Sequence, residues 1–279
     1  MAIVVNAGIA IDLAAAIRLL TGLRIAVLTG AGISTDSGIP DYRGPDSPPR
    51  KPMTYQQFVS DADYRRTYWA RNQIGWRYVR QTHPNDGHRA LAQLEAAGVV
   101  TGLITQNVDR LHTLAGSRAT IDLHGTYAQV ICLDCGALST RAEVAQQLDA
   151  LNPGFIEQVP DVEIAPDADA VIASTEGFVV AGCAACGGML KPDIVYFGEN
   201  VPRTRVQAAY AMVDEADALL VAGSSLTVQS GLRFVRHAAT AAKPIVIINR
   251  GTTRGDPMAT LKIDAGCSPV LLALATALS

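Results

Sequence analysis

Short apolar runs without polar alternation recur along the chain, and glycine or small polar residues follow each of them. The runs are residues 24–28, 102–105, 218–222 and 244–248. Strands buried on both faces have such continuous runs, because helices cover both sides of a parallel sheet. Between the runs, residues 88–97 and 205–214 have helical patterns. The alternation predicts an α/β fold with a doubly wound, mostly parallel, Rossmann-like sheet.

Two stretches break this alternation. Residues 46–87 are richer in Pro, Arg, Tyr and Trp, which predicts a small helical insertion with loops. Residues 131–189 contain paired cysteines and an acidic middle. We therefore expect a discontinuous Rossmann-like domain, made of residues 1–45, 88–130 and 190–279, with both insertions forming a smaller lobe.

The N-terminal segment is apolar, but Asp12 and Arg18 interrupt it. No charged segment precedes the apolar residues, so the pattern predicts a helix beginning near residue 11 rather than a secretory signal. A membrane span needs roughly 18 or more uninterrupted apolar residues, and no such run is present. The expected location is the cytoplasm.

Composition narrows the function classes. Hydrophobic residues make up 49% of the 279 residues and charged residues 18%, as in a soluble enzyme with a sizeable core. The net charge of −3 argues against a nucleic-acid surface, which would need clustered Lys and Arg. Five cysteines, an odd number, make a disulfide framework a poor explanation.

Residues 30–43 read GAGISTDSGIPDYR and follow the first apolar run. Glycines let a backbone approach a pyrophosphate, and a following helix would point its first amides at the anion. A tight turn without a ligand explains the glycines alone equally well. The third glycine is displaced to Gly38, so a dehydrogenase fingerprint fits poorly. Residues 39–43 add an anion, an aromatic ring and a cation, which suit a loop that covers a ligand and excludes water.

Residues 105–112, TQNVDRLH, follow the second apolar run. Polar residues at the carboxyl end of a parallel strand face the ligand crevice, although Asn and Asp also serve as helix caps. With the glycine turn upstream, we predict a pocket. His124 follows shortly after, and histidine is suited to proton transfer near neutral pH. Spacing alone does not select it from the chain's other histidines, which are His83, His88, His112 and His237.

Two Cys-x-x-Cys pairs, Cys132 with Cys135 and Cys183 with Cys186, are each followed by glycine. Four thiolates form a closed tetrahedral zinc site with no position open for water, so the ion would be structural. Two unrelated redox or buried pairs are the alternative. A catalytic zinc hydrolase would need His or carboxylate ligands and an open position. The smaller lobe is therefore expected to combine a helical module with a zinc-ribbon-like module.

The third and fourth apolar runs are also followed by pocket-forming candidates. Residues 223–228, GSSLTV, offer glycine and small hydroxyls suited to phosphate or ribose, and residues 249–251, NRG, suit a ribose. Each stretch alone is an ordinary strand-to-helix connection.

Taken together, these motifs resemble those of the sirtuins, which are NAD-dependent protein deacylases. The resemblance extends from about residue 23 to the C-terminus, with the motifs in family order. Residues 68–72 (YWARN), Gly75-Trp76 and the run CGGMLKPD look most like class II, the branch of the mitochondrial sirtuin of animals and its bacterial relatives. Residues 166–169 depart from the pattern, because a PDGD-like turn would be usual there.

The resemblance implies roles for individual residues. His124 would be the catalytic base, Asn107 would orient the nicotinamide ribose, and Asp109 would bind the carboxamide. The segment Val195, Tyr196, Phe197, Gly198 and Glu199 would pair with the acyl-lysine peptide by β-augmentation. The implied cofactor-binding residues are Gly30, Ala31, Gly32, Ser34, Thr35, Asp36, Ile39, Pro40, Asp41, Tyr42, Arg43, Gln106, Asn107, Val108, Asp109, His124, Gly223, Ser224, Ser225, Asn249, Arg250, Gly251 and Cys267.

The implied activity is removal of an acyl group from protein lysine with consumption of NAD, beside one structural Zn²⁺. The acyl oxygen would attack the ribose carbon that bears nicotinamide, and His124 would then take a ribose proton, allowing a cyclic intermediate to form and collapse with water. The products would be free lysine, nicotinamide and O-acyl-ADP-ribose. Acyl-lysine proteins or peptides are the expected partners, with no nucleic acid and no membrane. Tyr68 and Arg71 form a Tyr-x-x-Arg pair that either reads an acidic acyl group or belongs to a surface helix.

Three other functions compete with this one. An ADP-ribosyltransferase would use the same pocket, and only the lysine-binding segment favours deacylation over it. A non-catalytic NAD or zinc module would not need His124, Asn107 and Asp109 together. A dehydrogenase would leave the glycosidic bond of NAD intact, so nicotinamide release would exclude it.

Overall fold

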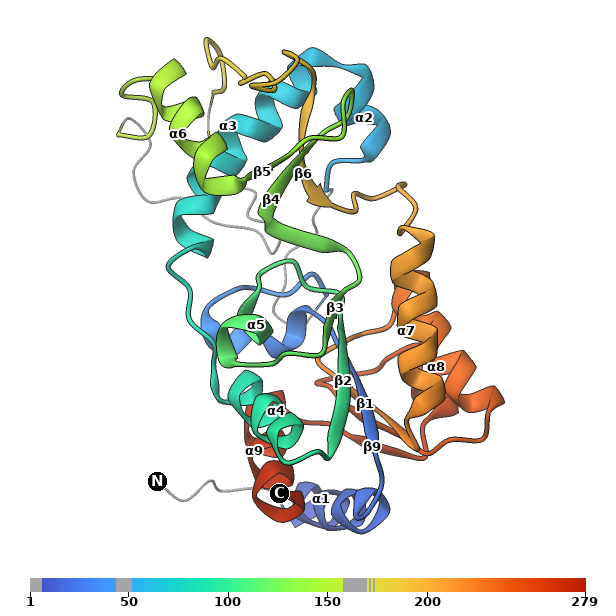
Figure 1. Cartoon of the computed structure of the whole chain (residues 1–279). Coiled ribbons are helices and arrows are strands. Elements are labelled where there is room, and N and C mark those ends of the chain that lie inside the picture. Colours follow the sequence, from blue (N-terminus) through green and yellow to red (C-terminus); the bar gives the residue numbers. More distant parts are fainter. Residues whose placement is uncertain (1–6, 44–51, 158–169, 171, 173) are drawn as a thin grey trace.

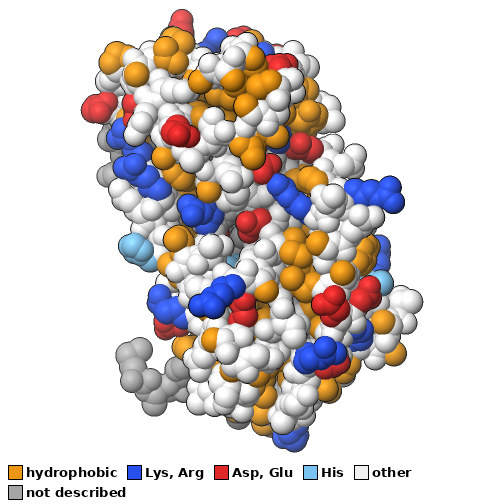
Figure 2. Space-filling model, viewed as in Figure 1, with side chains coloured by type: hydrophobic (Ala, Val, Ile, Leu, Met, Phe, Trp, Pro, Cys, Tyr) orange, Lys and Arg blue, Asp and Glu red, His pale blue; other side chains and the backbone are white. Residues whose placement is uncertain are grey.

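The molecule has a larger lobe and a smaller lobe (Figure 1), and Figure 2 shows its side chains from the same side. Residues from both lobes line a cleft. The computed structural model describes residues 7–43, 52–157, 170, 172 and 174–279. The expected turn at residues 166–169 lies outside the described residues, as do residues 1–6 and 44–51 of the expected domain ranges. Among the described helices, none is long and apolar enough to cross a bilayer.

A six-stranded sheet forms the centre of the larger lobe, in the order β3-β2-β1-β7-β8-β9. All of its pairings are parallel. The strands are β1 (Ile25–Thr29), β2 (Val100–Thr105), β3 (Thr120–Asp122), β7 (Ala218–Ala222), β8 (Ile245–Ile248) and β9 (Leu261–Ile263). The four predicted apolar runs are four of these strands, and every residue of β1, β7 and β8 is buried. The predicted doubly wound fold is confirmed.

Helices cover both faces of this sheet because alternate strand residues are apolar on both sides. On one face, α1 (Ala7–Leu20), α4 (Asp86–Ala96) and α9 (Cys267–Leu278) pack against Val27, Leu220 and Val246. On the other, α7 (Arg203–Glu215) and α8 (Gln229–Thr240) pack against Leu28 and Val221. Helix α1 begins at Ala7, earlier than the predicted start near residue 11.

The smaller lobe joins both insertions. Helices α2 (Tyr55–Ser60) and α3 (Ala62–Val79) form the helical module. A three-stranded antiparallel sheet in the order β5-β4-β6 forms the other, with α6 (Arg141–Leu151) against it. Its strands are β4 (Gly125–Cys132), β5 (Leu138–Thr140) and β6 (Leu190–Ile194). Pairing in this sheet therefore reaches beyond the expected range of residues 131–189 at both ends, because β4 and β6 pair with each other.

A buried arginine connects the two modules of the smaller lobe. Arg141 begins α6 and is fully buried. Its guanidinium lies over the rings of Trp69 and Trp76, at 5.4 and 5.3 Å, and donates to the side chains of Asn72 and Gln73 on α3. Burial lowers the pKa of Arg141 to about 10, which still leaves it charged at neutral pH. The stacked and bonded cation holds α6 against α3.

Short elements complete the chain near the cleft. They are the 3-10 turns η1 (Ala31–Ile33), η2 (Thr35–Ser37) and η3 (Asp256–Met258) and the helix α5 (Leu111–Ala115). The expectation of a helix directly after the first glycine turn is therefore wrong. The chain instead makes two 3-10 turns, and Gly38 ends the second in the left-handed conformation, with φ 87°.

Candidate functional site

A cavity of about 590 Å³ lies between the lobes, at the carboxyl ends of β1, β2, β7 and β8. In open parallel sheets this edge is where ligands bind. The loops after all four strands contribute lining residues, and so does the segment after β6. The predicted polar stretches, far apart in the sequence, thus meet in one place.

The glycine turn and residues 223–224 pack backbone against backbone. Gly32 N donates to Gly223 O at 2.8 Å, and a Cβ on Gly30 or Gly32 would lie 2.9 Å from that oxygen. Gly223 itself has φ 67°, and a Cβ there would lie 2.2 Å from Ile33 N. No larger residue fits these positions without moving the loops, which form one wall of the cavity.

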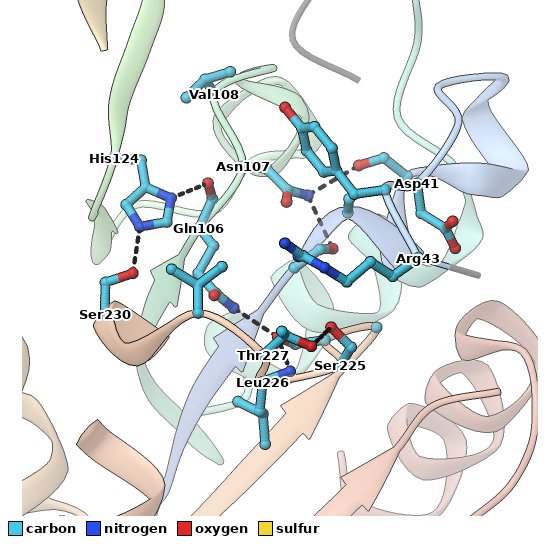
Figure 3. A pocket seen from close by; sticks show the side chains of 18 of the residues that line it. Asp41, Arg43, Gln106, Asn107, Val108, His124, Ser225, Leu226, Thr227 and Ser230 are labelled. Atoms are coloured by element: carbon cyan, nitrogen blue, oxygen red, sulfur yellow. Dashed lines mark hydrogen bonds between the residues drawn. The ribbon is translucent and has the colours of Figure 1, made fainter. Parts of the chain in front are cut away.

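Below this wall, Asn107 and Asp109 form a hydrogen-bonded group with Ser34. Ser34 Oγ donates to Asp109 at 2.7 Å, and Asn107 Nδ2 donates to Ser34 Oγ and to Gly30 O, both at 3.1 Å. Burial raises the pKa of Asp109, while the bonds from Leu111 N and Ser34 act in the opposite direction. The network brings the glycine turn and the TQNVD stretch together, and both Asn107 (Figure 3) and Asp109 line the cavity.

His112 does not line the cavity. It is buried beneath it, with Nε2 bonded to Thr29 Oγ1 at 2.9 Å, and its ring lies 4.7 Å from that of His88. Burial lowers the pKa of both histidines, that of His88 to about 4. Both rings are therefore neutral near pH 7 and support the strand ends.

His124 follows β3 and lines the cavity. Its Nδ1 lies 2.8 Å from Gln106 O, and its Nε2 lies 2.8 Å from Ser230 Oγ (Figure 3). A carbonyl oxygen only accepts, so the neutral ring has its hydrogen on Nδ1 and its lone pair on Nε2. Burial, with Arg233 and Arg205, lowers the pKa of His124, and the bond to Gln106 opposes this. A neutral imidazole with its lone pair on Nε2 is suited to act as a base.

The segment after β6 lies beside His124, because Val195 N donates to His124 O at 2.8 Å. Phe197 bridges in parallel to Thr54, and Tyr55 N donates to Phe197 O at 2.9 Å. All five residues predicted to bind the peptide line the cavity: Val195, Tyr196, Phe197, Gly198 and Glu199.

An ion pair with a buried lysine holds this segment in place. Lys191 is 3% exposed, and its Nζ lies 3.1 Å from Glu199 Oε2 and donates to Ile194 O at 2.6 Å. Glu199 Oε2 also accepts from Tyr196 N at 2.9 Å. The Tyr196 ring lies under the ammonium, at 5.0 Å. The start and end of the segment are thus fixed to one cation.

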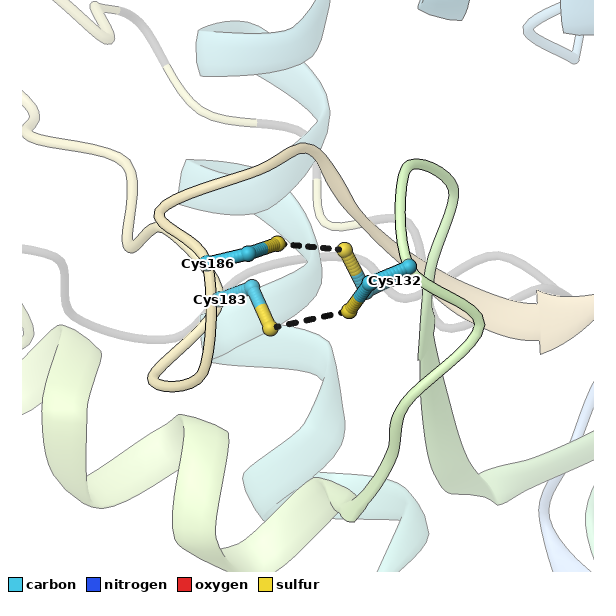
Figure 4. A group of neighbouring side chains, drawn as sticks. Cys132, Cys183 and Cys186 are labelled. Carbon is cyan, nitrogen blue, oxygen red and sulfur yellow. Dashed lines mark hydrogen bonds between the residues drawn. The ribbon is translucent and has the colours of Figure 1, made fainter.

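The four predicted metal ligands lie together. The Sγ atoms of Cys132, Cys135, Cys183 and Cys186 all lie within 4.8 Å of one another (Figure 4). The Sγ atoms of Cys132 and Cys186 are 3.6 Å apart and those of Cys135 and Cys183 are 3.9 Å apart, both longer than the S–S bond of about 2.05 Å. Backbone amides of Cys135 and Asp134 lower the pKa of Cys132 to about 7, whereas the neighbouring cysteine side chains raise the pKa of Cys186. The set fits one tetrahedral Zn²⁺ with no open position.

Glycines shape both cysteine turns in the same way. Gly136 and Gly187 each have φ 74°, and each donates its amide to the first cysteine of its pair. The trailing glycine of the motif is therefore required by the turn.

Most predicted cofactor residues line the cavity, but Thr35, Asp36 and Pro40 are not among the described lining residues. Thr35 Oγ1 donates to Gly32 O, and Asp36 accepts from Ser268 Oγ at 2.5 Å. These side chains support the loop from behind. Arg71 is also not a lining residue, and its Nε donates to Ala170 O at 2.7 Å, whereas Tyr68 does line the cavity.

Sequence reasoning missed further lining residues. They include Tyr127 on β4, Pro52 and Met53 before α2, and Gln229, Ser230 and Arg233 in the first turns of α8. The signal for Gln229 and Ser230 was present, because they directly follow the predicted stretch 223–228, which faces the crevice. Ser230, which bonds the candidate base, is the most consequential of these.

Comparison with known proteins agrees with this geometry. A model of the Sir2 family matches residues 30–230. The NAD-dependent protein deacetylase 1 of Mycobacterium avium (strain 104) is 64% identical over 94% of this chain and 94% of its own length. The solved structure described as "Structural Basis for the Mechanism and Regulation of Sir2 Enzymes" has a TM-score of 0.73 and 28% identity, covering 96% of this chain and 97% of that one. Another, "Sir2-p53 peptide-NAD+", has a TM-score of 0.67 and 31% identity, with coverages of 92% and 94%.

Proposed function

Because the chain belongs to the Sir2 family, we propose that it is an NAD-dependent protein-lysine deacylase. The reaction gives free lysine, nicotinamide and O-acyl-ADP-ribose. The observation that supports this most strongly is that four features meet in one cavity. They are the glycine turn, the Asn107–Asp109 network, His124 and residues 195–199, the segment proposed to bind the peptide (the peptide segment).

NAD supplies the ribose carbon to which the acyl oxygen adds as nicotinamide leaves. The Gly30–Gly32 and Gly223 loops, packed backbone against backbone, line the part of the cavity that suits its pyrophosphate. Asn249 and Gly251, at the carboxyl end of β8, suit the adenosine ribose. Asp109 and Asn107 suit the carboxamide and the nicotinamide ribose, because a carboxyl group and an amide provide acceptors and donors at fixed positions.

His124 acts on the ribose hydroxyls. Its Nδ1–H is fixed on Gln106 O, so Nε2 takes the proton and the imidazolium forms. The lowered pKa keeps the ring neutral before that step at neutral pH. The proposed role of Asn107 is positional.

The acyl-lysine peptide adds as a strand beside residues 195–199, where backbone bonds supply affinity with modest sequence preference. Its acyl group enters among Tyr68, Tyr127 and Tyr196, which line the cavity. The structure gives Arg71 a backbone partner, and we propose that Arg71 orders its own lobe rather than reading an acidic acyl group.

Three finer points belong to the same proposal. The YWARN and CGGMLKPD runs support placement in the class II branch. The helical insertion and the cysteine module form one small lobe, supported by their shared core. A cytoplasmic location is supported by the use of four cysteines as candidate metal ligands, because reducing compartments keep thiols available for metal binding.

The test is nicotinamide release from NAD by zinc-loaded protein, with and without acetyl-lysine peptide. Release that requires the peptide and yields O-acetyl-ADP-ribose supports the deacylase. Release accompanied by ADP-ribose attached to protein, with the peptide still acetylated, would instead identify an ADP-ribosyltransferase.

A further inference from the structure

Ser230 is bonded directly to the candidate base. Its Oγ lies 2.8 Å from His124 Nε2, and this is its one hydrogen bond to another side chain or backbone group in the described part of the chain. Since Nδ1 holds the ring hydrogen against Gln106 O, the Ser230 hydroxyl is the donor to Nε2 while the ring is neutral.

The position of Ser230 is set by a rigid element. It is the second residue of α8, is 8% exposed, and precedes Leu232, Phe234 and Val235, which pack into the sheet core. The hydroxyl is therefore held at the ring by the packing of the whole helix.

Gln106 and the first turn of α8, which bond the two ring nitrogens of His124, also pack against each other. A Cβ on Gly231 would lie 2.5 Å from Gln106 Oε1, so the first turn of α8 rests directly on the Gln106 segment. Gln106 supplies the acceptor for Nδ1, and Ser230 supplies the partner for Nε2. Glycine at residue 231 allows this close approach, which fixes both edges of the imidazole.

We propose that Ser230 is a positioning residue for His124, whose hydroxyl orients the neutral ring and then accepts a hydrogen bond from Nε2 once that nitrogen has taken a proton. The inference rests on the proposed function for the identity of the base. A hydroxyl both donates and accepts, so the contact persists in both protonation states. When the ribose hydroxyl gives its proton to Nε2, the Ser230 hydroxyl turns its own hydrogen away from that nitrogen, and the ribose oxygen keeps the electron pair. Donation of the new N–H to Ser230 leaves that oxygen free to react.

The bond to the imidazolium is the stronger of the two, because charge-assisted hydrogen bonds exceed neutral ones. Ser230 therefore favours the protonated ring and offsets part of the burial that lowers the pKa of His124. The other charged groups around the ring are Arg233 on α8 and Arg205 on α7, which both lower that pKa. Asp193 on β6 is paired with Arg205, and Asp122 at the end of β3 interacts with Arg205 as well. None of them replaces the bond to Nε2.

The experiment is an NMR titration of the His124 ring in zinc-loaded protein without substrate, with the signal assigned by its loss in His124→Asn. Removing the hydroxyl in Ser230→Ala should lower the pKa of His124 by roughly half to one unit, about a three- to tenfold change in the protonation constant. Ser230→Thr, which keeps the hydroxyl, should restore the wild-type value. Ser60→Ala on α2, whose hydroxyl bonds Gln56 O, is the control and should leave it unchanged.

The same variants are then assayed for deacylation. Ser230→Ala should reduce kcat about three- to tenfold and move the acid limb of the pH profile to lower pH, with the KM for NAD little changed. An unchanged or raised pKa of His124 in Ser230→Ala would overturn the inference even if the protein is an active deacylase. A lowered pKa in a protein that never releases nicotinamide would instead contradict the proposed function and leave the Ser230–His124 contact established.

Discussion

At the scale of single residues, the site depends on side chains whose partners fix their protonation and orientation. His124 is held through both nitrogens, and Asp109 is held by Ser34 and the amide of Leu111. The Lys191–Glu199 ion pair fixes the position of residues 195–199, although neither residue is hydrogen-bonded to the candidate base in the described part of the chain. Such supporting contacts decide the precision of a site, and they lead to two predictions.

Breaking the Lys191–Glu199 pair should weaken peptide binding specifically. Lys191→Met leaves Glu199 without its cation and releases Ile194 O, so the KM for the acyl peptide should rise about tenfold or more, while the KM for NAD changes little. The loss of a buried partner costs about 1–3 kcal/mol. Arg24→Ala is the matched control, because the Arg24–Asp217 pair is exposed, and exposed pairs contribute about 0–1 kcal/mol. Equal rises in both KM values would show that the pair acts on the whole cleft.

Acyl preference should not depend on Arg71. Its Nε is bonded to Ala170 O and it does not line the cavity, so Arg71→Ala should change turnover of acetyl and succinyl peptides by the same factor. Steady-state rates with the two peptides test this. A selective loss of succinyl turnover, rescued in part by Arg71→Lys, would assign the guanidinium to the acyl group instead.

At the scale of elements, the loops after the parallel strands build the cavity, and two of them meet through glycine. The Gly223→Ala variant should lose NAD binding by at least about tenfold, since its Cβ would overlap Ile33 N. Gly98→Ala is the control: it has a similar positive φ, 77°, but open space around its Cβ. Both variants incur the strain of a positive φ, about 1–3 kcal/mol. Calorimetric titration with NAD would contradict the account if the two variants bound equally.

The strands and turns differ in how well the sequence predicts them. Continuous apolar runs fixed the positions of β1, β2, β7 and β8 because strands covered on both faces must be apolar throughout. Short strands such as β3 and β9 gave no such signal, because three residues are too few for a pattern. The two 3-10 turns after β1 were missed since their backbone is set by the contact with Gly223 across the sheet, which local pattern does not encode.

The residues of the candidate site also differ in how well the sequence predicts them. Asn107 and Asp109, which belong to one long motif, line the same cavity, as predicted. The four cysteines of the two Cys-x-x-Cys motifs lie together at a separate site, also as predicted. Thr35 and Asp36 belong to a motif but turn away to bond neighbouring groups. Ser230 and Tyr127 lie outside the motifs, and only the docking of α8 and β4 beside the cavity reveals them.

At the scale of the whole molecule, the smaller lobe must be held in place for the cleft to exist. Its zinc module packs with the aromatic residues of α3 in one core, and Arg141 ties α6 to Trp69 and Trp76. The peptide segment follows β6 of the same small sheet. Because β4 pairs with β6, we expect loss of order in the metal site to reach the side of the cleft that is proposed to bind the peptide.

Removing zinc should abolish activity by loosening the smaller lobe. Chelation is expected to lower the melting temperature and expose Trp69 and Trp76, which tryptophan fluorescence reports. Reconstitution with Co²⁺ should restore kcat to within about twofold, because four thiolates leave no open position for catalysis by the metal. A kcat that changed severalfold with the identity of the metal, at equal thermal stability, would argue for direct participation.

The central claim is that His124 performs acyl transfer to NAD-derived ADP-ribose in this cleft. The most direct measurement is the formation of O-acetyl-ADP-ribose from NAD and acetyl-lysine peptide by the wild-type and His124→Ala proteins, both zinc-loaded and of matched thermal stability. The account predicts one product per lysine released by the wild type, and a loss of about a hundredfold or more in the variant, in line with general-base catalysis. Comparable product formation by His124→Ala would contradict it.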